Sequence, residues 1–271
     1  INVVTAPNVS ISNITPFCVN SLNTTLNASP AGGTWSGNGV LDPATGSFSP
    51  STAGVGTPTI TYTYTSGPCT VSANSTVTIN GLPAVSAGAD VAVCSGSSIG
   101  LQASGANTYQ WSISGGAATG LSNSSIANPQ ASPTNTTTYT VLGVDGNGCT
   151  NTDNVQVTVN NLPNVAAGAD ASICPGLGTG LAASGATNYS WTPTTGLSNA
   201  SIAGPTANPS ATTTYTVTGT DSNGCVDTDQ VTITVYPQPN VNATSNSPIL
   251  ECGTVSLNVT GLNTVQWSTQ P

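Results

Sequence analysis

Alternating runs of apolar and polar residues recur along the chain and predict β-strands. β-Branched and aromatic residues alternate with threonine in 59–65, 137–142 and 213–218, with the period of two that half-buried strands show. Residues 155–159 and 231–235 alternate in the same way. No stretch has helical periodicity. Proline and glycine interrupt the runs at short intervals, so the pattern predicts an all-β sandwich rather than a helical or mixed fold.

Short turns rich in Asp, Asn and Gly separate the strands of each predicted pair. Residues 145–148 read Asp-Gly-Asn-Gly, and residues 221–224 read Asp-Ser-Asn-Gly at the same place in the next pair. Asn-Gly between two alternating runs is the strongest short-range signal for a β-hairpin. Each pair is therefore predicted to be a hairpin.

A pattern of proline, cysteine and tryptophan occurs four times, and the fourth copy is shortened. The copies begin at Pro7, Pro83, Pro163 and Pro239, and continue to Cys18, Cys94, Cys174 and Cys252 and to Trp35, Trp111, Trp191 and Trp267. A fixed period indicates an array of like units. We expect residues 1–5 to end a preceding repeat, 6–81, 82–161 and 162–237 to form three repeats, and 238–271 to begin a fourth.

Each repeat is predicted to be an immunoglobulin-like β-sandwich, and the array is predicted to be elongated. The tryptophan recurs at one place in every copy, which favours a buried position at the centre of the core. Burial of one such ring stabilises a fold by a few kcal/mol. The competing interpretation is an exposed tryptophan on which a sugar stacks.

Charge excludes several classes of partner. The 271 residues include no Lys, Arg or His and nine acidic residues, for a net charge of −9. Such a surface cannot neutralise phosphates, so nucleic acid is not an expected partner. It also offers no basic patch for anionic lipid. No apolar run reaches the length of a membrane span, so direct membrane insertion is not expected.

Seven cysteines, used two per repeat, indicate an oxidising, extracellular setting. Zinc is not expected, because the chain has no His and no Cys-x-x-Cys motif. A catalytic thiol would lack a base to activate it. Two pairing schemes are open. Pairing within each repeat would give Cys18–Cys69, Cys94–Cys149 and Cys174–Cys225.

Topology favours pairing between repeats. In an immunoglobulin-like sandwich the first and last hairpin turns lie at opposite poles, about 17–20 Å apart, whereas a disulfide needs Cα atoms about 4.4–6.8 Å apart. The first-turn cysteine of one repeat would instead meet the last-turn cysteine of the next. This scheme predicts Cys18–Cys149 and Cys94–Cys225, and leaves Cys69, Cys174 and Cys252 to pair outside these repeats.

The carboxylates offer a weak candidate metal site. Asp145, Asn147, Asp221 and Asn223 could supply oxygen ligands to calcium, but the same residues are favoured in tight turns, and we prefer the turn interpretation. Asp153, Asp227 and Asp229 are expected to solvate a strand, and Asp90 and Asp170 are expected to cap turns at the junctions between repeats. No paired carboxylates or other catalytic set is recognisable, so an enzyme is not expected, and no cofactor beyond calcium is indicated.

Several phrases carry a resemblance to a known group of repeats. They are Ala-Gly-Ala-Asp-x-x-x-Cys at 87–94 and 167–174, Tyr-x-Trp at 109–111 and 189–191, and Thr-Thr-Tyr-Thr-Val at 137–141 and 213–217. The chain resembles the tandem immunoglobulin-like or PKD-like repeats of very large Bacteroidetes cell-surface adhesins. That resemblance implies export by type IX secretion, a place at the cell surface and, for some members, a link to gliding motility. It covers the second and third repeats well and the first only in outline.

Three functions follow as hypotheses. The first is a structural or adhesive segment of a giant secreted surface protein, forming a disulfide-stabilised stalk or filament whose partners are neighbouring repeats of the same polypeptide. The second is a glycan-binding array that uses exposed aromatics such as Tyr62, Tyr64 or Tyr236. The third is lateral assembly of identical chains into a sheath or fibre through Thr- and Asn-rich faces.

Overall fold

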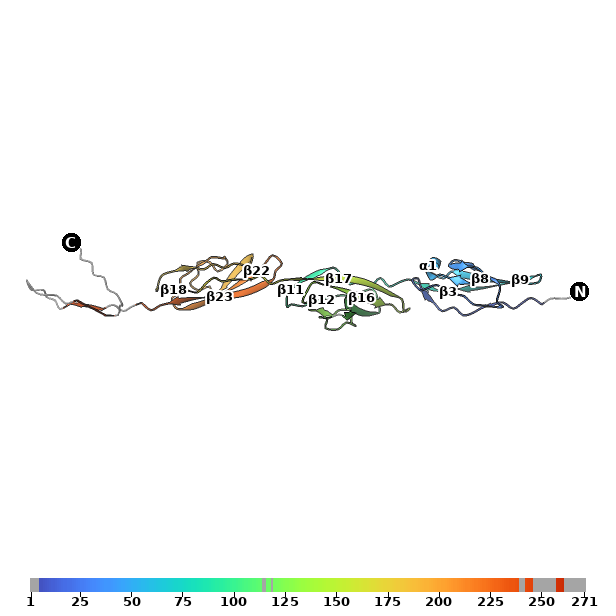
Figure 1. Ribbon diagram of the computed structural model, residues 1–271, viewed down its shortest axis with the longest axis horizontal. Helices are drawn as coiled ribbons and strands as arrows, with labels where there is room; N and C mark the ends of the chain where they lie inside the picture. Colours follow the sequence, from blue (N-terminus) through green and yellow to red (C-terminus); the bar gives the residue numbers. More distant parts are fainter. Residues whose placement is uncertain (1–4, 114–115, 118, 239–241, 246–256, 261–271) are drawn as a thin grey trace, which may run out of the picture. The chain divides into compact units, whose positions relative to one another are not determined.

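The computed structural model describes residues 5–113, 116, 117, 119–238, 242–245 and 257–260 (Figure 1). The chain divides into two compact units, Ile1–Val159 and Asn160–Pro271. Nearly all regular structure is β, as predicted. The described residues contain three separate hydrophobic cores, one for each of the first three copies of the repeat pattern. Cys252 and Trp267 of the fourth copy lie outside the described residues, and the repeat boundaries stay predictions.

The first repeat is built from short strands. Its elements are β1 (Ser10–Ile11), β2 (Phe17–Cys18), β3 (Thr24–Thr25), β4 (Ala28–Ser29), β5 (Thr34–Gly37), β6 (Val40–Asp42), β7 (Ser47–Phe48), α1 (Pro50–Ala53), β8 (Thr59–Ser66), β9 (Cys69–Thr76) and β10 (Ile79–Asn80). One three-stranded sheet has the order β5-β8-β9, and a second has the order β3-β7-β6. The predicted run 59–65 is β8, and it continues into the hairpin partner β9.

The helix α1 corrects the expectation that the chain has no helix. Ser49 caps its N-terminus by accepting a hydrogen bond from the backbone N–H of Thr52, and Pro50 occupies the first turn. A single turn of four residues is too short to show helical periodicity, so only these capping residues could have signalled it.

The second repeat forms a larger sheet. Its elements are β11 (Val91–Cys94), β12 (Ile99–Gly100), β13 (Thr108–Ile113), β14 (Gly116–Ala117), β15 (Gln130–Ala131), β16 (Thr137–Val144) and β17 (Thr150–Asn160). The sheet order is β11-β17-β16-β13-β14, and β12 pairs with β15 in a smaller sheet. The predicted hairpin is β16–β17, with its turn at 145–148.

The third repeat has the same plan. Its elements are β18 (Ala171–Ile173), β19 (Thr179–Gly180), β20 (Asn188–Thr192), β21 (Thr206–Ala207), β22 (Thr213–Thr220) and β23 (Val226–Val235), and they are followed by β24 (Asn242–Ser245) and β25 (Leu257–Thr260). The main sheet runs β18-β23-β22-β20, beside the small pair β19–β21. The first strand, β18, pairs in parallel with the last, β23.

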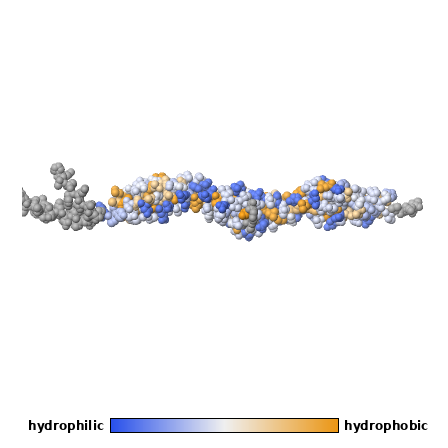
Figure 2. Space-filling view, in the orientation of Figure 1, coloured by the Kyte–Doolittle hydropathy of each residue, from blue (hydrophilic) through white to orange (hydrophobic). Residues whose placement is uncertain are grey.

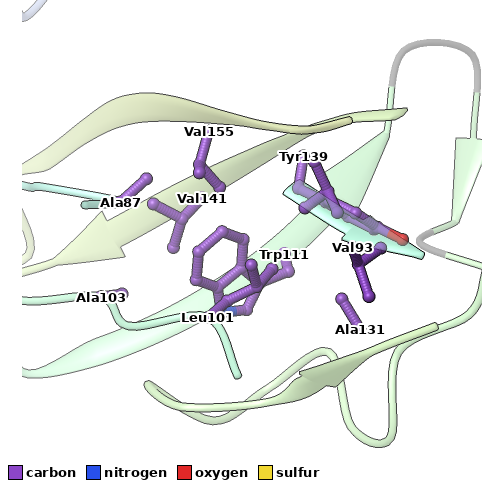
Figure 3. Packing of buried hydrophobic residues seen from close by; sticks show 10 residues of the cluster. Ala87, Val93, Leu101, Ala103, Trp111, Ala131, Tyr139, Val141 and Val155 are labelled. Atoms are coloured by element: carbon purple, nitrogen blue, oxygen red, sulfur yellow. The ribbon is translucent and has the colours of Figure 1, made fainter. Parts of the chain in front are cut away.

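Aromatic side chains fill the cores. Trp35, Trp111 and Trp191 are 4%, 1% and 1% exposed, so the buried-core interpretation is confirmed for these three tryptophans. In the second repeat Trp111 lies among Val141 and Leu101 (Figure 3). The two facing layers of each repeat meet at these rings, which makes the fold an immunoglobulin-like sandwich.

The surface is polar but carries little charge. Figure 2 shows pale, weakly polar residues over much of the visible face, with apolar residues scattered among them. Because this chain has no basic side chain, it cannot form ion pairs between side chains. Hydrogen bonds must therefore supply the polar contacts that stabilise each repeat.

Candidate functional site

A disulfide joins the first and second repeats. Cys18 ends β2, and Cys149 lies directly before β17. Their sulfur atoms are bonded, and their Cα atoms are 5.5 Å apart, within the usual range for a disulfide. This is the first of the two pairings between repeats that topology predicts.

The turn before β17 holds Cys149 in place. Asp145 Oδ1 accepts hydrogen bonds of 2.8 Å from the backbone N–H groups of Asn147 and Cys149. The Asp145 N–H donates in return to the Cys149 carbonyl at 3.0 Å. Cys149 is fully buried. One carboxylate thus fixes both the turn and the cysteine that forms the link.

The first-turn cysteine is also fixed by local bonds. The Cys18 N–H donates to Ser21 Oγ at 3.1 Å, and the Ser21 N–H donates to the Cys18 carbonyl at 2.9 Å. Cys18 also lies opposite Asn80 in the parallel pair of β2 and β10. Both sulfur atoms are therefore positioned by backbone contacts within their own repeats.

The alternative scheme of pairing within repeats is wrong. Cys69 and Cys174 are free thiols, which removes Cys18–Cys69 and Cys174–Cys225, and the bond from Cys149 to Cys18 removes Cys94–Cys149.

Strand register gives the physical reason. In the third repeat Ile173 lies opposite Val235, ten residues after Cys225. At about 3.3 Å per residue, Cys174 and Cys225 are therefore about 33 Å apart. The same register holds in the first repeat, where Asn80 faces Cys18. The separation is larger than the strand length assumed from sequence, because the last strand is long.

The third repeat reproduces the turn that holds Cys149. Asp221 Oδ1 accepts from the N–H groups of Asn223 and Cys225, both at 2.8 Å. Cys225 is fully buried. Cys94 and Cys225 are both disulfide-bonded cysteines.

The four calcium candidates therefore have a defined role in turns. The Asp145 and Asp221 carboxylates bind backbone N–H groups, and Asn147 and Asn223 lie within the loops that these bonds close. Among the described residues no group of three or more His, Cys, Asp or Glu side chains could hold a metal ion. A role in calcium binding stays a prediction.

A second set of carboxylates connects distant strands, which sequence reasoning missed. Asp153 Oδ2 accepts from the Ala87 N–H at 2.8 Å, and Asp90 Oδ1 accepts from the Gln156 N–H at 2.8 Å. The N–H of Ala87, followed by that of Asn154, lowers the pKa of the Asp153 carboxyl from its usual value. Asp153 was expected only to solvate its strand; it holds the first segment of the repeat against the last.

The third repeat has the same pair of connections. Asp229 accepts from the Ala167 N–H and Asp170 from the Thr232 N–H, both at 2.8 Å. The Ala167 N–H is the main cause of the lowered pKa of Asp229. The signal that could have revealed this role is the recurrence of both aspartates at matching places in two repeats.

Every aspartate in the described ranges accepts a backbone N–H. Besides the six above, Asp42 accepts from Ala44 at 2.9 Å and Asp227 from Thr228 at 2.9 Å. These carboxylates hold turns and strands together, and they do not form the paired acid and base that hydrolysis requires.

The aromatic residues proposed for glycan stacking differ in exposure. Tyr62 is only 2% exposed; its hydroxyl donates to the Pro30 carbonyl and accepts from the Gly33 N–H, both at 2.6 Å. The expectation that Tyr62 is an exposed platform is therefore wrong, because the ring belongs to the core of the first repeat. Tyr64 is partly buried, and Tyr236 is 58% exposed.

Threonine rows line the exposed face of the β8–β9 hairpin. The hydroxyls pair across the strands, as Thr61 with Asn74, Thr63 with Ser72 and Thr65 with Thr70, at 2.8–3.0 Å. Cross-strand bonds of this kind stabilise a sheet. They also occupy part of the hydrogen-bonding capacity that lateral assembly would use.

Within the described ranges no apolar helix reaches the length that crossing a bilayer requires.

Comparison with known proteins gives similarity to solved structures only. No protein-family model and no curated protein matches the chain. Immunoglobulin domains 1–5 of Sidekick-1 are 15% identical with a TM-score of 0.30, and the match covers 87% of this chain and 60% of that one. Extracellular domains 3–5 of Drosophila OTK are 10% identical with a TM-score of 0.35, over 83% and 95% of the two chains. The eight N-terminal domains of Down Syndrome Cell Adhesion Molecule are 13% identical with a TM-score of 0.31, over 93% and 44%. This chain thus spans about three fifths of the Sidekick-1 segment, and likenesses of this size carry no argument about activity or partners.

Proposed function

We propose that this chain is a tension-bearing segment of a secreted surface protein, in which disulfides join each immunoglobulin-like repeat to the next. The observation that supports the proposal most directly is the Cys18–Cys149 bond between the first two repeats. Structural disulfides persist in oxidising compartments, so the bond supports an extracellular location. The expected repeats are 6–81, 82–161 and 162–237, followed by the start of a fourth at 238.

The same scheme extends to the next pair of repeats. Cys94 and Cys225 occupy the positions that Cys18 and Cys149 occupy one repeat earlier. Cys18 and Cys149 are 131 residues apart, and Cys94 and Cys225 are also 131 apart. We therefore propose a Cys94–Cys225 bond, and we propose that Cys69 and Cys174 pair with cysteines of further repeats.

These bonds would change how the chain carries load. Taken alone, the Cys18–Cys149 bond passes tension applied outside it through the two sulfur atoms, so the residues between the two cysteines carry none of it. Those residues, at about 3.4 Å each when extended, represent about 450 Å of hidden length. A segment built in this way keeps its length even when a repeat unfolds, which suits a stalk or filament.

Composition and resemblance support a place at the cell surface. The chain has no Lys or Arg, so it offers no cleavage site to trypsin-like proteases. The resemblance to repeats of Bacteroidetes adhesins supports an adhesive parent protein exported by type IX secretion. In this proposal the main partners are neighbouring repeats of the same polypeptide.

Stretching single molecules tests the proposal. Two serine substitutions, Cys94→Ser and Cys225→Ser, leave only the bond between the first two repeats. This chain, oxidised and pulled from its ends, should extend about 450 Å less than the same chain with Cys149→Ser added. Cys69→Ser, which removes a free thiol, is the matched control and should leave the extension of the oxidised chain unchanged. If the oxidised wild type extends as far as the reduced chain, the proposal that tension passes through the disulfides is refuted.

Peptide mapping without reduction tests the second bond. Chymotrypsin suits this chain because trypsin has no site in it. The proposal requires a peptide that joins Cys94 to Cys225. Any other partner for either cysteine would limit the covalent link to the first two repeats.

A further inference from the structure

The first repeat contains a buried tryptophan whose indole N–H has no acceptor among the residues that the structure describes. In the second and third repeats, Trp111 Nε1 donates to the Ile126 carbonyl and Trp191 Nε1 to the Ile202 carbonyl, both at 2.9 Å. Trp35 is 4% exposed, yet its Nε1–H donates to no residue in the described part of the chain. Because no fully buried side-chain nitrogen or oxygen there is left without a partner, Trp35 Nε1 must reach solvent.

Trp35 lines a hollow of about 170 Å³ on the surface of the first repeat, which offers its Nε1–H a route to solvent. The lining of the hollow includes the aromatic residues Trp35 and Tyr62, together with Asn27, Gly33 and Thr45. The rings of Trp35 and Tyr62 lie 4.7 Å apart and are tilted by 49°. The hollow thus combines an aromatic wall with a polar rim.

A glycine keeps the indole accessible. Gly46 is buried with φ +73°, and a Cβ added there would lie 2.6 Å from Trp35 Nε1. A larger residue would therefore press on the N–H. Positive φ also favours glycine at this position.

The rim selects for a neutral, hydroxylated ligand. Asp42 is the nearest carboxylate in sequence, and both its oxygens are engaged: Oδ1 accepts from the Ala44 N–H at 2.9 Å, and Oδ2 accepts from Thr45 Oγ1 at 2.7 Å. Because the Thr45 hydroxyl donates its proton to Asp42, it offers lone pairs to a ligand donor. The amide of Asn27 can both donate and accept.

Charge excludes the other small ligands. The chain has no cationic side chain, so nothing would balance a phosphate, sulfate or acidic sugar. A cation would need free carboxylate oxygens, and those of Asp42 are occupied. An indole N–H donor, an amide and a hydroxyl acceptor beside aromatic rings match the hydroxyls and the apolar face of a neutral sugar ring.

Size limits the ligand to one unit. A water molecule occupies about 30 Å³, so the hollow has room for about five to six waters. That space suits a single sugar ring, and it is smaller than the roughly 300–1,000 Å³ of drug-sized pockets.

We propose that this hollow binds one unit of a neutral saccharide, with the Trp35 Nε1–H donating to a sugar hydroxyl. The site is independent of the disulfide proposal, since it lies wholly within the first repeat. It also differs from stacking on an exposed tyrosine, because the aromatic rings form the wall of the hollow and stay in the core. So small a contact predicts dissociation constants on the order of millimolar.

Nitrogen–proton NMR of the whole chain tests the site. The indole cross-peak of Trp35 is assigned with the variant Trp35→Phe, and the methyl glycosides of glucose, galactose, mannose and N-acetylglucosamine are titrated in turn. At least one glycoside should shift the Trp35 indole peak in a saturable way. The indole peaks of Trp111 and Trp191, whose N–H groups are already bonded, should not move.

Variants separate the site from a general effect of the sugar. Asn27→Ala should weaken saturation at least several-fold, whereas Asn23→Ala, an exposed asparagine of the same repeat that does not line the hollow, should leave it unchanged. Circular dichroism checks that each variant is folded.

Three results would overturn the proposal. No shift of the Trp35 peak with any glycoside would mean that the N–H binds water only. An equal shift with N-methylacetamide would indicate a general carbonyl acceptor, such as a peptide. Equal weakening by Asn23→Ala would place the binding elsewhere.

Discussion

The first repeat and the two that follow share a sandwich but hold it together differently. In the second and third repeats each core tryptophan donates to a carbonyl, and each first segment is bonded to an aspartate of the last strand. In the first repeat Trp35 has no such acceptor among the described residues, and the strand register places Ala73 where the second repeat has Asp153. The comparison shows that the buried ring is the common requirement, while the polar bonds around it vary from repeat to repeat.

The cysteine turn shows the same difference. Cys149 and Cys225 follow an aspartate that accepts their N–H groups, and both are fully buried. Cys69 follows Gly67 and Pro68 with no aspartate in the turn, and it is partly exposed and free. The aspartate turn therefore accompanies the cysteines that are bonded in this structure.

Removing the disulfide should have the largest effect. Cys149→Ser should lower the free energy of unfolding of the first two repeats by about 2–4 kcal/mol, because the loop that the bond closes is long. Cys69→Ser should change stability by less than about 0.5 kcal/mol, as expected of a free thiol near the surface. Denaturant unfolding of the oxidised proteins measures both changes. Equal losses of unfolding free energy in the two variants would contradict a stabilising role for the Cys18–Cys149 bond.

The tryptophans should respond unequally to phenylalanine. Trp111→Phe removes ring area and also leaves the Ile126 carbonyl without its donor, whereas Trp35→Phe removes area alone. The loss at Trp111 should exceed the loss at Trp35 by about 1–3 kcal/mol. Hydrogen exchange resolved by repeat provides the local stabilities. A larger loss at Trp35 would contradict the assignment of its N–H to the hollow.

A glycine in the second repeat leaves little room for a side chain. The strand register places Gly143 where the first repeat has Tyr64. A Cβ at Gly143 would lie 2.5 Å from Val85 Cγ2 and 2.7 Å from Ala106 Cβ. Gly143→Ser should therefore cost about 1–3 kcal/mol.

A matched control for that substitution is Gly180→Ser in the third repeat, where an added Cβ meets nothing within 4 Å. Thermal unfolding compares the two variants. Similar losses would show that crowding at Gly143 is relieved by small movements of the strand.

Acid should weaken the second repeat through Asp153, and this effect should be the smallest. The Ala87 N–H lowers the pKa of this carboxyl in the folded state, so the folded protein binds its proton less readily than the unfolded chain, whose aspartates titrate near about 3.9. Stabilisation is therefore present above that value and is lost as the pH falls through the lower, folded pKa.

The variant Asp153→Ala, which copies Ala73 of the first repeat, tests this dependence. Its midpoint of thermal unfolding should fall less steeply on acidification than that of the wild type. Asp227→Asn is the control, because Asp227 accepts only from its neighbour Thr228. Parallel curves for wild type and Asp153→Ala would exclude a contribution from the bond to Ala87.

Sequence predicted the parts of this fold that repeat locally. Alternation located β8, β16 and β22, Asn-Gly located two hairpin turns, and recurrence placed the tryptophans in the core. Connections over long distances were not visible: Asp153 and Ala87 are 66 residues apart, and no local pattern marks their bond. The burial of Tyr62 was missed for a similar reason, since its hydroxyl bonds to Pro30 and Gly33 about thirty residues away.

The bond from Cys18 to Cys149 has a further consequence for damage. A single backbone cut between these residues would leave both pieces attached, because the disulfide connects the chain on either side of the break. Proteases cut preferentially at exposed loops. A repeat nicked in this way would lose a loop but not its place in the chain.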